Sequence, residues 1–173
     1  YDHSSNTFSL KQAPLEQIPY ETNFFDMVIC SEVLEHVRDV ETCLAELKRV
    51  LKPQGLLCIS VPRFWPEKIC WFLSESYHKV KGGHLRIFKK KQLLKSLNKQ
   101  NFSLIKQHYA HAFHSPYWWL KCAIKKQDSK VIKGFEKVLL KDMYKFPSKP
   151  NPIEALLNPI FGKSLVFYCI NND

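Results

Sequence analysis

The pattern of apolar and polar positions along the chain predicts strands and helices in alternation. Phe25–Cys30 is a short apolar run, typical of a strand buried on both faces. Apolar residues then recur at helical spacing from Val40 to Leu51, which predicts an amphipathic helix closed by a basic turn and a breaker, Lys52–Gly55. Leu56–Val61 follows as a second buried strand. This order predicts a βαβ unit with parallel strands.

A further helix and further strands continue the pattern. The helix is predicted over Phe88–Gln100, strands over Phe102–Tyr109 and Ser164–Ile170, and a weaker strand over Thr7–Lys11. Two long segments, 62–83 and 110–161, interrupt the alternation. Because ligands of open α/β sheets bind outside the carboxyl ends of the strands, we interpret both segments as insertions at that edge.

The second of these segments contains a basic amphipathic helix. Lysines recur every four residues along it: Lys133, Lys137, Lys141 and Lys145. Apolar residues occupy the other side: Ile132, Phe135, Leu139 and Met143. Such a helix can lie on a membrane surface, or its apolar side can pack against its own domain.

Composition and charge narrow the class of protein. A chain of 173 residues that is 45% hydrophobic and 24% charged fits one globular domain with a core and excludes a disordered or collagen-like chain. The net charge is −4 over residues 1–78, +15 over 79–149 and −1 over 150–173. The basic block favours an anionic partner, unless it is simply a solvated surface. A membrane is favoured over nucleic acid, because Arg86 is the block's only arginine for bidentate base contacts.

Cysteines, glycines and the first residue add to the picture. The six cysteines lack the spacing of a metal finger and are typical of reduced thiols in a cytoplasmic protein. Apolar runs are shorter than the roughly 20 residues that span a bilayer, so we expect peripheral membrane contact at most. None of the five glycines forms a phosphate-binding loop. The chain opens on Tyr1, which we interpret as the start of a fragment or of a processed form.

An ordered set of motifs carries a family resemblance. The motifs are Ile18–Tyr20, Phe25–Val37 and Leu47–Gly55, extended by Gly82–Phe88. In this order they are similar to the Leu-Pro-Phe turn, the Phe-Asp strand with its Glu-x-x-Glu-His segment, and the Leu-Lys-Pro-Gly-Gly turn of class I S-adenosylmethionine-dependent methyltransferases. Within that family the chain most resembles the type 11 and quinone-methyltransferase-like branch.

The resemblance implies a Rossmann-like, doubly wound α/β sheet of seven strands. Residues 1–173 would form a partial domain that runs from the third or fourth strand to the seventh, with the two insertions. The family's first strand and glycine-rich cofactor turn have no counterpart here, so we expect these residues alone to be inactive. The alternative is a degenerate, non-catalytic module of the same fold that docks on a membrane or nucleic acid through its basic segment.

The resemblance also implies the cofactor and the reaction. The cofactor is S-adenosylmethionine, and the methyl group goes to an oxygen or carbon of a small or lipid-like acceptor. Cys30, Ser31 and Glu32 follow the strand that ends beside the cofactor in the family, although Cys30 is equally well explained as a buried thiol. Leu15 and Glu16 stand where the family reaches the adenine ring, but without the aspartate that many relatives use there.

Two carboxylates and an imidazole suggest a metal site. Glu32, Glu35 and His36 have the spacing of neighbours on one helical face, and such groups can hold a divalent cation that polarises a hydroxyl. Some quinone O-methyltransferases and small-RNA 2′-O-methyltransferases, which the pattern resembles, add a later histidine, and the resemblance implies His84 for that role. His36 and His84 are therefore the catalytic candidates. Alternatively, Glu35 and His36 only orient their loop.

The interrupting segments are rich in aromatic residues. Four of them are candidates for the walls of an acceptor pocket: Trp65, Trp71, Tyr117 and Trp118. Alternatively, they simply pack the layer that covers the site. Among the remaining histidines, His111 and His114 are the stronger candidates for acid–base work because they lie near these aromatic residues in the sequence.

Overall fold

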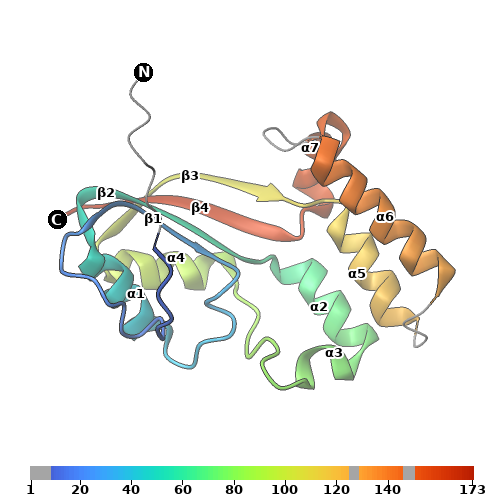
Figure 1. The fold of residues 1–173 in the computed structure, drawn as a ribbon, viewed down its shortest axis with the longest axis horizontal. Helices are drawn as coiled ribbons and strands as arrows, with labels where there is room; N and C mark the ends of the chain where they lie inside the picture. The colour runs from blue at the N-terminus through green and yellow to red at the C-terminus, as the bar shows by residue number, and fades with distance from the viewer. Residues whose placement is uncertain (1–8, 125–128, 146–150) are drawn as a thin grey trace.

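A four-stranded sheet forms the centre of the molecule (Figure 1). The computed structural model describes residues 9–124, 129–145 and 151–173. The strands lie in the order β1-β2-β4-β3, and β1 and β2 are parallel whereas β4 is antiparallel to both of its neighbours. Their bounds are β1 Phe25–Ser31, β2 Leu51–Pro62, β3 Phe102–Ala110 and β4 Ser164–Asn171. The fold is thus an open α/β sheet, as the alternation predicted.

Two amphipathic helices, α1 (Val40–Val50) and α4 (Lys90–Lys99), cover one face of this sheet (Figure 1). Asp39 caps α1 by accepting a hydrogen bond from the backbone N–H of Thr42 at 3.1 Å. The leucines of both helices pack into one core with the inward side chains of β2 and β4. Members of this core include Leu44, Leu47, Leu93, Leu97, Leu57, Ile59 and Phe167.

The opposite face of the sheet is less covered. Because side chains alternate along a strand, Met27 and Ile29 of β1 point away from α1 and α4. They are 53% and 68% exposed. In the described ranges, no helix buries these two side chains, so the expectation that this strand is buried on both faces was wrong.

The remaining helices gather at the end of the sheet where β1 and β2 finish (Figure 1). α2 follows β2 after one residue, α5 follows β3, and α7 precedes β4. This is the edge at which the segments 62–83 and 110–161 were expected. No helix in the described part of the chain has the length and hydropathy needed to cross a bilayer. The bounds are α2 Phe64–Leu73, α3 Glu75–Lys79, α5 His114–Ala123, α6 Lys130–Lys145 and α7 Pro152–Phe161.

The basic amphipathic helix predicted in the second segment is α6. Ile132 and Leu139 are buried against Tyr117 of α5, so its apolar side packs against its own domain. Lys133, Lys137 and Lys141 are exposed. The side chains of Met143 and Lys145 lie outside the described residues.

Two local expectations were wrong. The segment Lys52–Gly55 does not lie outside the strand, because β2 already begins at Leu51 and the segment bulges within it, between the pairs Phe25–Leu51 and Met27–Leu56. Gln54 adopts a φ of 60° in this bulge. The weak strand Thr7–Lys11 is also not formed at residues 9–11, and its first two residues lie outside the described part of the chain.

Candidate functional site

The site lies at the carboxyl ends of the parallel strands β1 and β2. Ser31 and Ser60 are register partners there, and their hydroxyl oxygens are 2.9 Å apart. The Ser60 hydroxyl donates to Glu32 Oε1 at 2.8 Å, and the Glu32 backbone N–H donates to the Ser60 carbonyl at 3.0 Å. This edge is where ligands of open α/β sheets bind.

The segment from Glu32 to His36 leaves the sheet as a turn. The expectation that it is helical was wrong, because Glu32 has a φ of 52° and α1 begins only at Val40. A left-handed residue cannot continue a right-handed helix. The backbone N–H of His36 closes the turn on the carbonyl of Val33 at 2.9 Å. Glu32 consequently points to Ser60 and not to the two residues with which it was expected to share a helical face.

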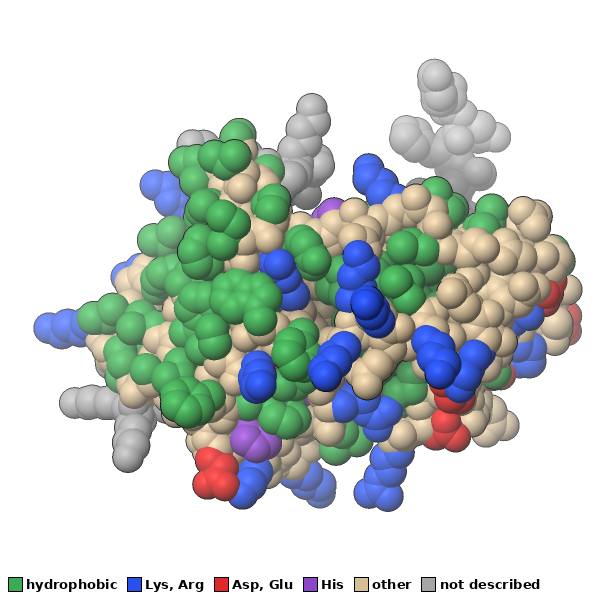
Figure 2. Space-filling model, turned by 180° about the vertical axis from the view of Figure 1, so that it is seen from behind, with side chains coloured by type: hydrophobic (Ala, Val, Ile, Leu, Met, Phe, Trp, Pro, Cys, Tyr) green, Lys and Arg blue, Asp and Glu red, His purple; other side chains and the backbone are tan. Residues whose placement is uncertain are grey.

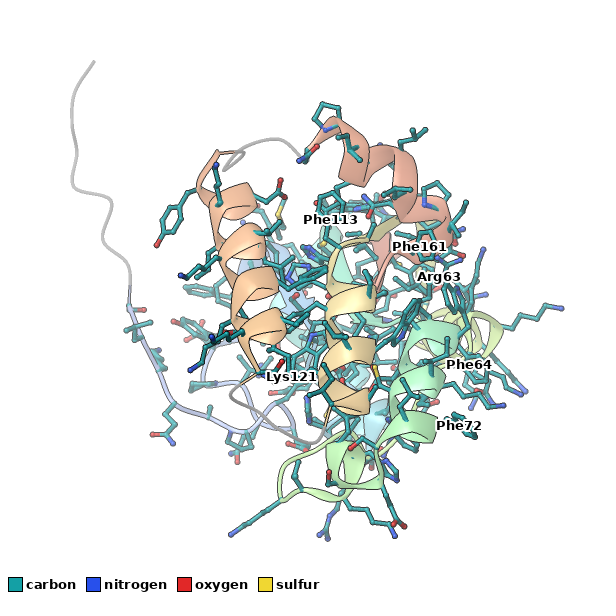
Figure 3. The ribbon with its side chains drawn as sticks, turned by 90° about the vertical axis from the view of Figure 1, so that its right-hand side faces the viewer. Arg63, Phe64, Phe72, Phe113, Lys121 and Phe161 are labelled. Carbon is teal, nitrogen blue, oxygen red and sulfur yellow. The ribbon has the colours of Figure 1, made fainter. Side chains whose placement is uncertain are left out.

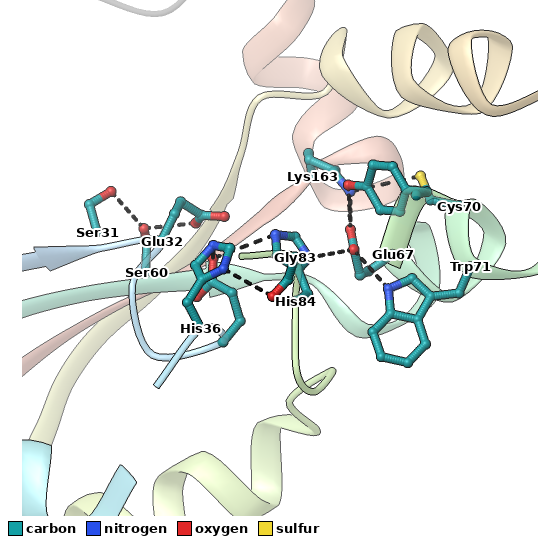
Figure 4. A network of polar contacts seen from close by, with 12 residues as sticks. Ser31, Glu32, His36, Ser60, Glu67, Cys70, Trp71, Gly83, His84 and Lys163 are labelled. Atoms are coloured by element: carbon teal, nitrogen blue, oxygen red, sulfur yellow. Dashed lines mark hydrogen bonds and ion pairs between the residues drawn. The ribbon is translucent and has the colours of Figure 1, made fainter. Parts of the chain in front are cut away.

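Glu35, His36 and His84 are nevertheless brought together. The rings of His36 and His84 lie side by side in Figure 4. Glu35 Oε1 lies 3.8 Å from His36 Nε2 and 4.0 Å from His84 Nε2, and the two imidazole rings are 4.8 Å apart. Glu35 is fully buried, and among the described residues neither carboxylate oxygen has a hydrogen-bond partner. Burial, with a smaller contribution from the Glu32 charge, raises the pKa of Glu35 to about 7.

The other nitrogen of each imidazole is occupied by a fixed acceptor. His36 Nδ1 lies 3.3 Å from the Gly83 carbonyl, and His84 Nδ1 lies 2.6 Å from Glu67 Oε1. A carbonyl and a carboxylate only accept hydrogen bonds, so Nδ1 of each ring carries a proton, and the Nε2 atom of each ring faces Glu35. Metal-binding histidines are oriented in this way by groups behind them.

Glu67 anchors this arrangement, and the sequence analysis missed it. Its buried carboxylate accepts hydrogen bonds from His84, from Trp71 Nε1 at 3.1 Å and from Tyr77 at 3.4 Å, and it contacts the ammonium of Lys163 (Figure 4). Burial alone would raise the pKa of Glu67, but the His84 hydrogen bond and the Lys163 charge outweigh it and hold the pKa at about 2. The Lys163 partner lies 96 residues away in sequence, so no local signal pointed to it.

The residues expected to bind the cofactor lie in two places. Ser31 is exposed at the end of β1, with Glu32 half-buried beside it. Cys30 is buried in the core, and burial raises its pKa to about 12. Leu15 packs against the same core, and the exposed Glu16 lies next to the Cys43 thiol in the first turn of α1.

The four aromatic candidates do not line one pocket. The Trp71 ring stacks on the His78 ring, with the ring centroids 4.4 Å apart. The Trp118 ring contacts the Tyr77 ring, with the centroids 5.5 Å apart, and Tyr77 connects it to the site. Trp65 instead packs against Trp119 and Phe161. Phe161 lies at the end of α7, beside α2 and α5 (Figure 3). Tyr117 points to α6 and donates to Glu136 at 2.6 Å.

Comparisons with known proteins agree with this architecture. Residues 2–59 match the family model of a methyltransferase domain. An uncharacterized methyltransferase of Schizosaccharomyces pombe is 40% identical over 53 residues, and an uncharacterized protein of Methanocaldococcus jannaschii is 40% identical over 58 residues. Each match covers 31% of this chain, and it covers 19% and 25% of those proteins, respectively. The chain thus spans about a quarter or less of these curated relatives.

Solved structures share the fold over nearly the whole chain. A proposed methyltransferase of Bacillus halodurans superposes with a TM-score of 0.56 at 20% identity, covering 94% of this chain and 71% of that one. A protein of Thermotoga maritima described as a possible histamine N-methyltransferase superposes with a TM-score of 0.53 at 16% identity. The match covers 92% of this chain and 62% of that one. Residues 2–59 thus have the sequence of a methyltransferase domain, and the described residues share the open α/β fold of these solved structures.

Proposed function

We propose that the protein transfers a methyl group from S-adenosylmethionine to an oxygen of a small or lipid-like acceptor, with a divalent cation at the site. The observation that carries this proposal is the buried carboxylate of Glu35, which faces the Nε2 atoms of His36 and His84. One carboxylate oxygen and two imidazole nitrogens suit a divalent transition metal. The burial of an unpartnered carboxylate also fits, because a bound cation would offset the cost of its charge.

The bound groups would supply an electrophilic methyl group and a Lewis acid that lowers the pKa of an acceptor hydroxyl. The residues of this chain would hold the bound groups and orient the side chains that contact them. Glu67 fixes the His84 ring, the Gly83 carbonyl fixes the His36 ring, and Ser31 and Glu32 line the strand edge where the cofactor binds in our proposal. Positioning of this kind is the main demand of an in-line displacement. A metal that activates a hydroxyl favours an oxygen acceptor over carbon.

The experiment uses the full-length protein and methyl-labelled S-adenosylmethionine. A panel of hydroxylated small molecules and lipids is assayed with magnesium, manganese or zinc and with a chelator. We expect metal-dependent transfer that Glu35→Gln and His84→Ala each lower at least about 100-fold, and that the exposed His108→Ala leaves unchanged. Binding of S-adenosylhomocysteine, measured by calorimetry, should persist in all three variants.

The outcomes separate the parts of the proposal. Transfer that resists the chelator and both site variants would exclude the metal but keep the methyltransferase. No binding of S-adenosylhomocysteine by the unaltered protein would exclude the activity itself. The non-catalytic docking module is not favoured, because the methyltransferase domain sequence and fold are both present.

We also propose that the helical end of the molecule contacts an anionic membrane. α7 exposes apolar side chains: Ile153, Leu156 and Ile160 are 62%, 78% and 60% exposed, and Phe72 of α2 is 89% exposed. Figure 2 shows hydrophobic side chains gathered over this end, with Lys and Arg side chains beside them. Exposed apolar patches next to basic residues, such as Lys137 and Lys141 of α6, are typical of surfaces that bind anionic lipid.

Liposome flotation tests the membrane proposal. The protein should float with phosphatidylserine-containing vesicles and not with pure phosphatidylcholine. Leu156→Glu and the double variant Lys137→Glu/Lys141→Glu should each abolish flotation, whereas Ile105→Glu, on the exposed edge strand β3, should not. Flotation that is equal for all variants would exclude this surface as the contact.

A further inference from the structure

Three potential ligands gather where α7 packs against the turn between β3 and α5, away from the site described above. His111 lies in that turn, His114 begins α5, and Glu154 lies in the first turn of α7. Their ligand atoms all lie within 4.8 Å of one another. The methyl-transfer proposal uses none of these residues.

Glu154 is placed against the usual rule for a surface helix. It is the only charged residue of α7, and it is 8% exposed while Ile153, Leu156 and Ile160 face outward. Among the described residues its carboxylate forms no hydrogen bond or ion pair, and a ring nitrogen of each of the two histidines lies within 4.8 Å of one of its oxygens. The charge of a largely buried side chain is costly unless it is paired. A cation between these groups would remove that cost.

The two histidines are suited to receive a metal. His114 Nδ1 is buried and has no hydrogen-bond partner in the described part of the chain. An imidazole nitrogen without a hydrogen-bond partner is available as a metal ligand. His111 adopts a φ of 64°, a left-handed conformation that brings its ring to 5.2 Å from that of His114.

Other contacts hold α7 in register with this turn. Asn158 Oδ1 accepts the backbone N–H of Ala112 at 2.9 Å, next to His111. Arg63 donates to the Ile160 carbonyl at 3.1 Å. A Cβ at Gly162 would come within 2.7 Å of the Tyr109 side chain, so the end of α7 approaches β3 closely. The first turn of α7, with Glu154, is therefore positioned by contacts that do not involve the three ligands.

We propose that His111, His114 and Glu154 bind a divalent metal ion of the zinc class, which fastens α7 to the turn between β3 and α5. Two imidazoles and one carboxylate form a common zinc ligand set, with bonds of about 2.0–2.2 Å. Ligand atoms bound at that length lie roughly 3–3.5 Å from one another, so small side-chain movements close the 4.8 Å cluster. The exposed His111 leaves a route for the ion from solvent.

The test is zinc binding to the full-length protein, stripped of metal and titrated against a chromophoric chelator. His84→Ala provides the background, because it removes the other cluster from the count. In that background we expect one zinc ion per chain. Adding Glu154→Gln or His114→Ala should weaken its binding at least about 10-fold, and adding His108→Ala should not. Zinc should also raise the melting temperature of the His84→Ala protein and not that of its Glu154→Gln derivative.

Folding of the variants is measured separately from their zinc binding. Circular dichroism of each metal-free variant shows whether it folds, and His111→Ala serves as a second ligand variant because its exposed side chain contributes little to packing. If the His84→Ala background binds no zinc, or if it binds one ion that none of the three ligand variants weakens, the proposed site does not exist. These results do not depend on methyl transfer, so the failure of one proposal leaves the other intact.

Discussion

Lys163 and Glu67 form a buried ion pair that joins the two clusters of potential metal ligands. The Lys163 ammonium contacts the Glu67 carboxylate, which in turn holds His84 at 2.6 Å. The backbone N–H of the same lysine donates to the His111 carbonyl at 3.4 Å. One residue, immediately before β4, thus supports the orientation of a histidine in each cluster.

Removal of this lysine should destabilise the protein strongly. Lys163→Met leaves the Glu67 charge buried without its cation, which costs about 3–5 kcal/mol in comparable pairs. Urea unfolding of Lys163→Met should show that loss, and Lys79→Met should show no measurable change because Lys79 and its partner Glu75 are both exposed. The double variant Lys163→Met/Glu67→Gln should recover part of the stability. A loss of less than about 1 kcal/mol in Lys163→Met would contradict the pairing.

The contribution of Glu35 to the stability of the metal-free protein should fall as the pH rises from about 4.5 to about 7. The pKa of Glu35 is raised from 4.5 to about 7 by burial, so in this window the folded state binds a proton that the unfolded state has lost. The slope for one proton is at most about 1.4 kcal/mol per pH unit. Unfolding measured across this window should show the slope in the unaltered protein and a smaller one in Glu35→Gln. Equal slopes would place the Glu35 pKa near its ordinary value.

Glu67 should act in the opposite direction and at lower pH. Its folded-state pKa is about 2, so its contribution to stability is complete above pH 4.5 and is lost as the pH falls toward 2. Glu67→Gln should therefore be less stable at pH 5 but lose less stability on acidification. Urea midpoints at pH 5, 4 and 3 provide the measurement, with the exposed Glu21→Gln as a control. An acid dependence that Glu67→Gln does not change would show that Glu67 is not held as a charged acceptor.

Much of the fold could be predicted from the sequence, because a buried face of a strand or helix requires apolar residues at a regular spacing. α1 and β2 are buried on defined faces, so their apolar positions repeat as helices and strands require. The family resemblance added His84, which no local pattern connects to Glu35. The turn at Glu32 was not predicted, because a single left-handed residue leaves no trace in the hydrophobic period.

Side-chain pairs between segments that are distant along the chain could also not be predicted from the sequence. Glu67 stands in an aromatic stretch that reads as ordinary packing, and its partner Lys163 is determined only by where α2 docks against the start of β4. Glu154 had no role in the sequence analysis. Glu154 is buried because its side of α7 faces the turn at His111. Tertiary contacts, such as the hydrogen bond from the Ala112 backbone N–H to Asn158, determine which side of the helix faces that turn.

Two glycines offer a matched pair for the backbone. In the bulge of β2, a Cβ at Gly55 would come within 2.8 Å of the Leu51 side chain and of the Lys52 carbonyl, and Leu51 is fully buried and cannot move away. Gly134 lies in α6 with nothing within 4 Å of an added Cβ. The same substitution should therefore have opposite effects at the two positions.

Gly55→Ala should lower the free energy of unfolding by about 1–3 kcal/mol, the usual cost of an overpacked position. Gly134→Ala should raise it by about 0.5–1 kcal/mol, because alanine favours the helix and restricts the unfolded chain. Urea midpoints of the two variants, measured side by side, provide the comparison. A neutral Gly55→Ala would mean that Leu51 can yield, and a destabilising Gly134→Ala would mean that this face of α6 is covered in the folded protein.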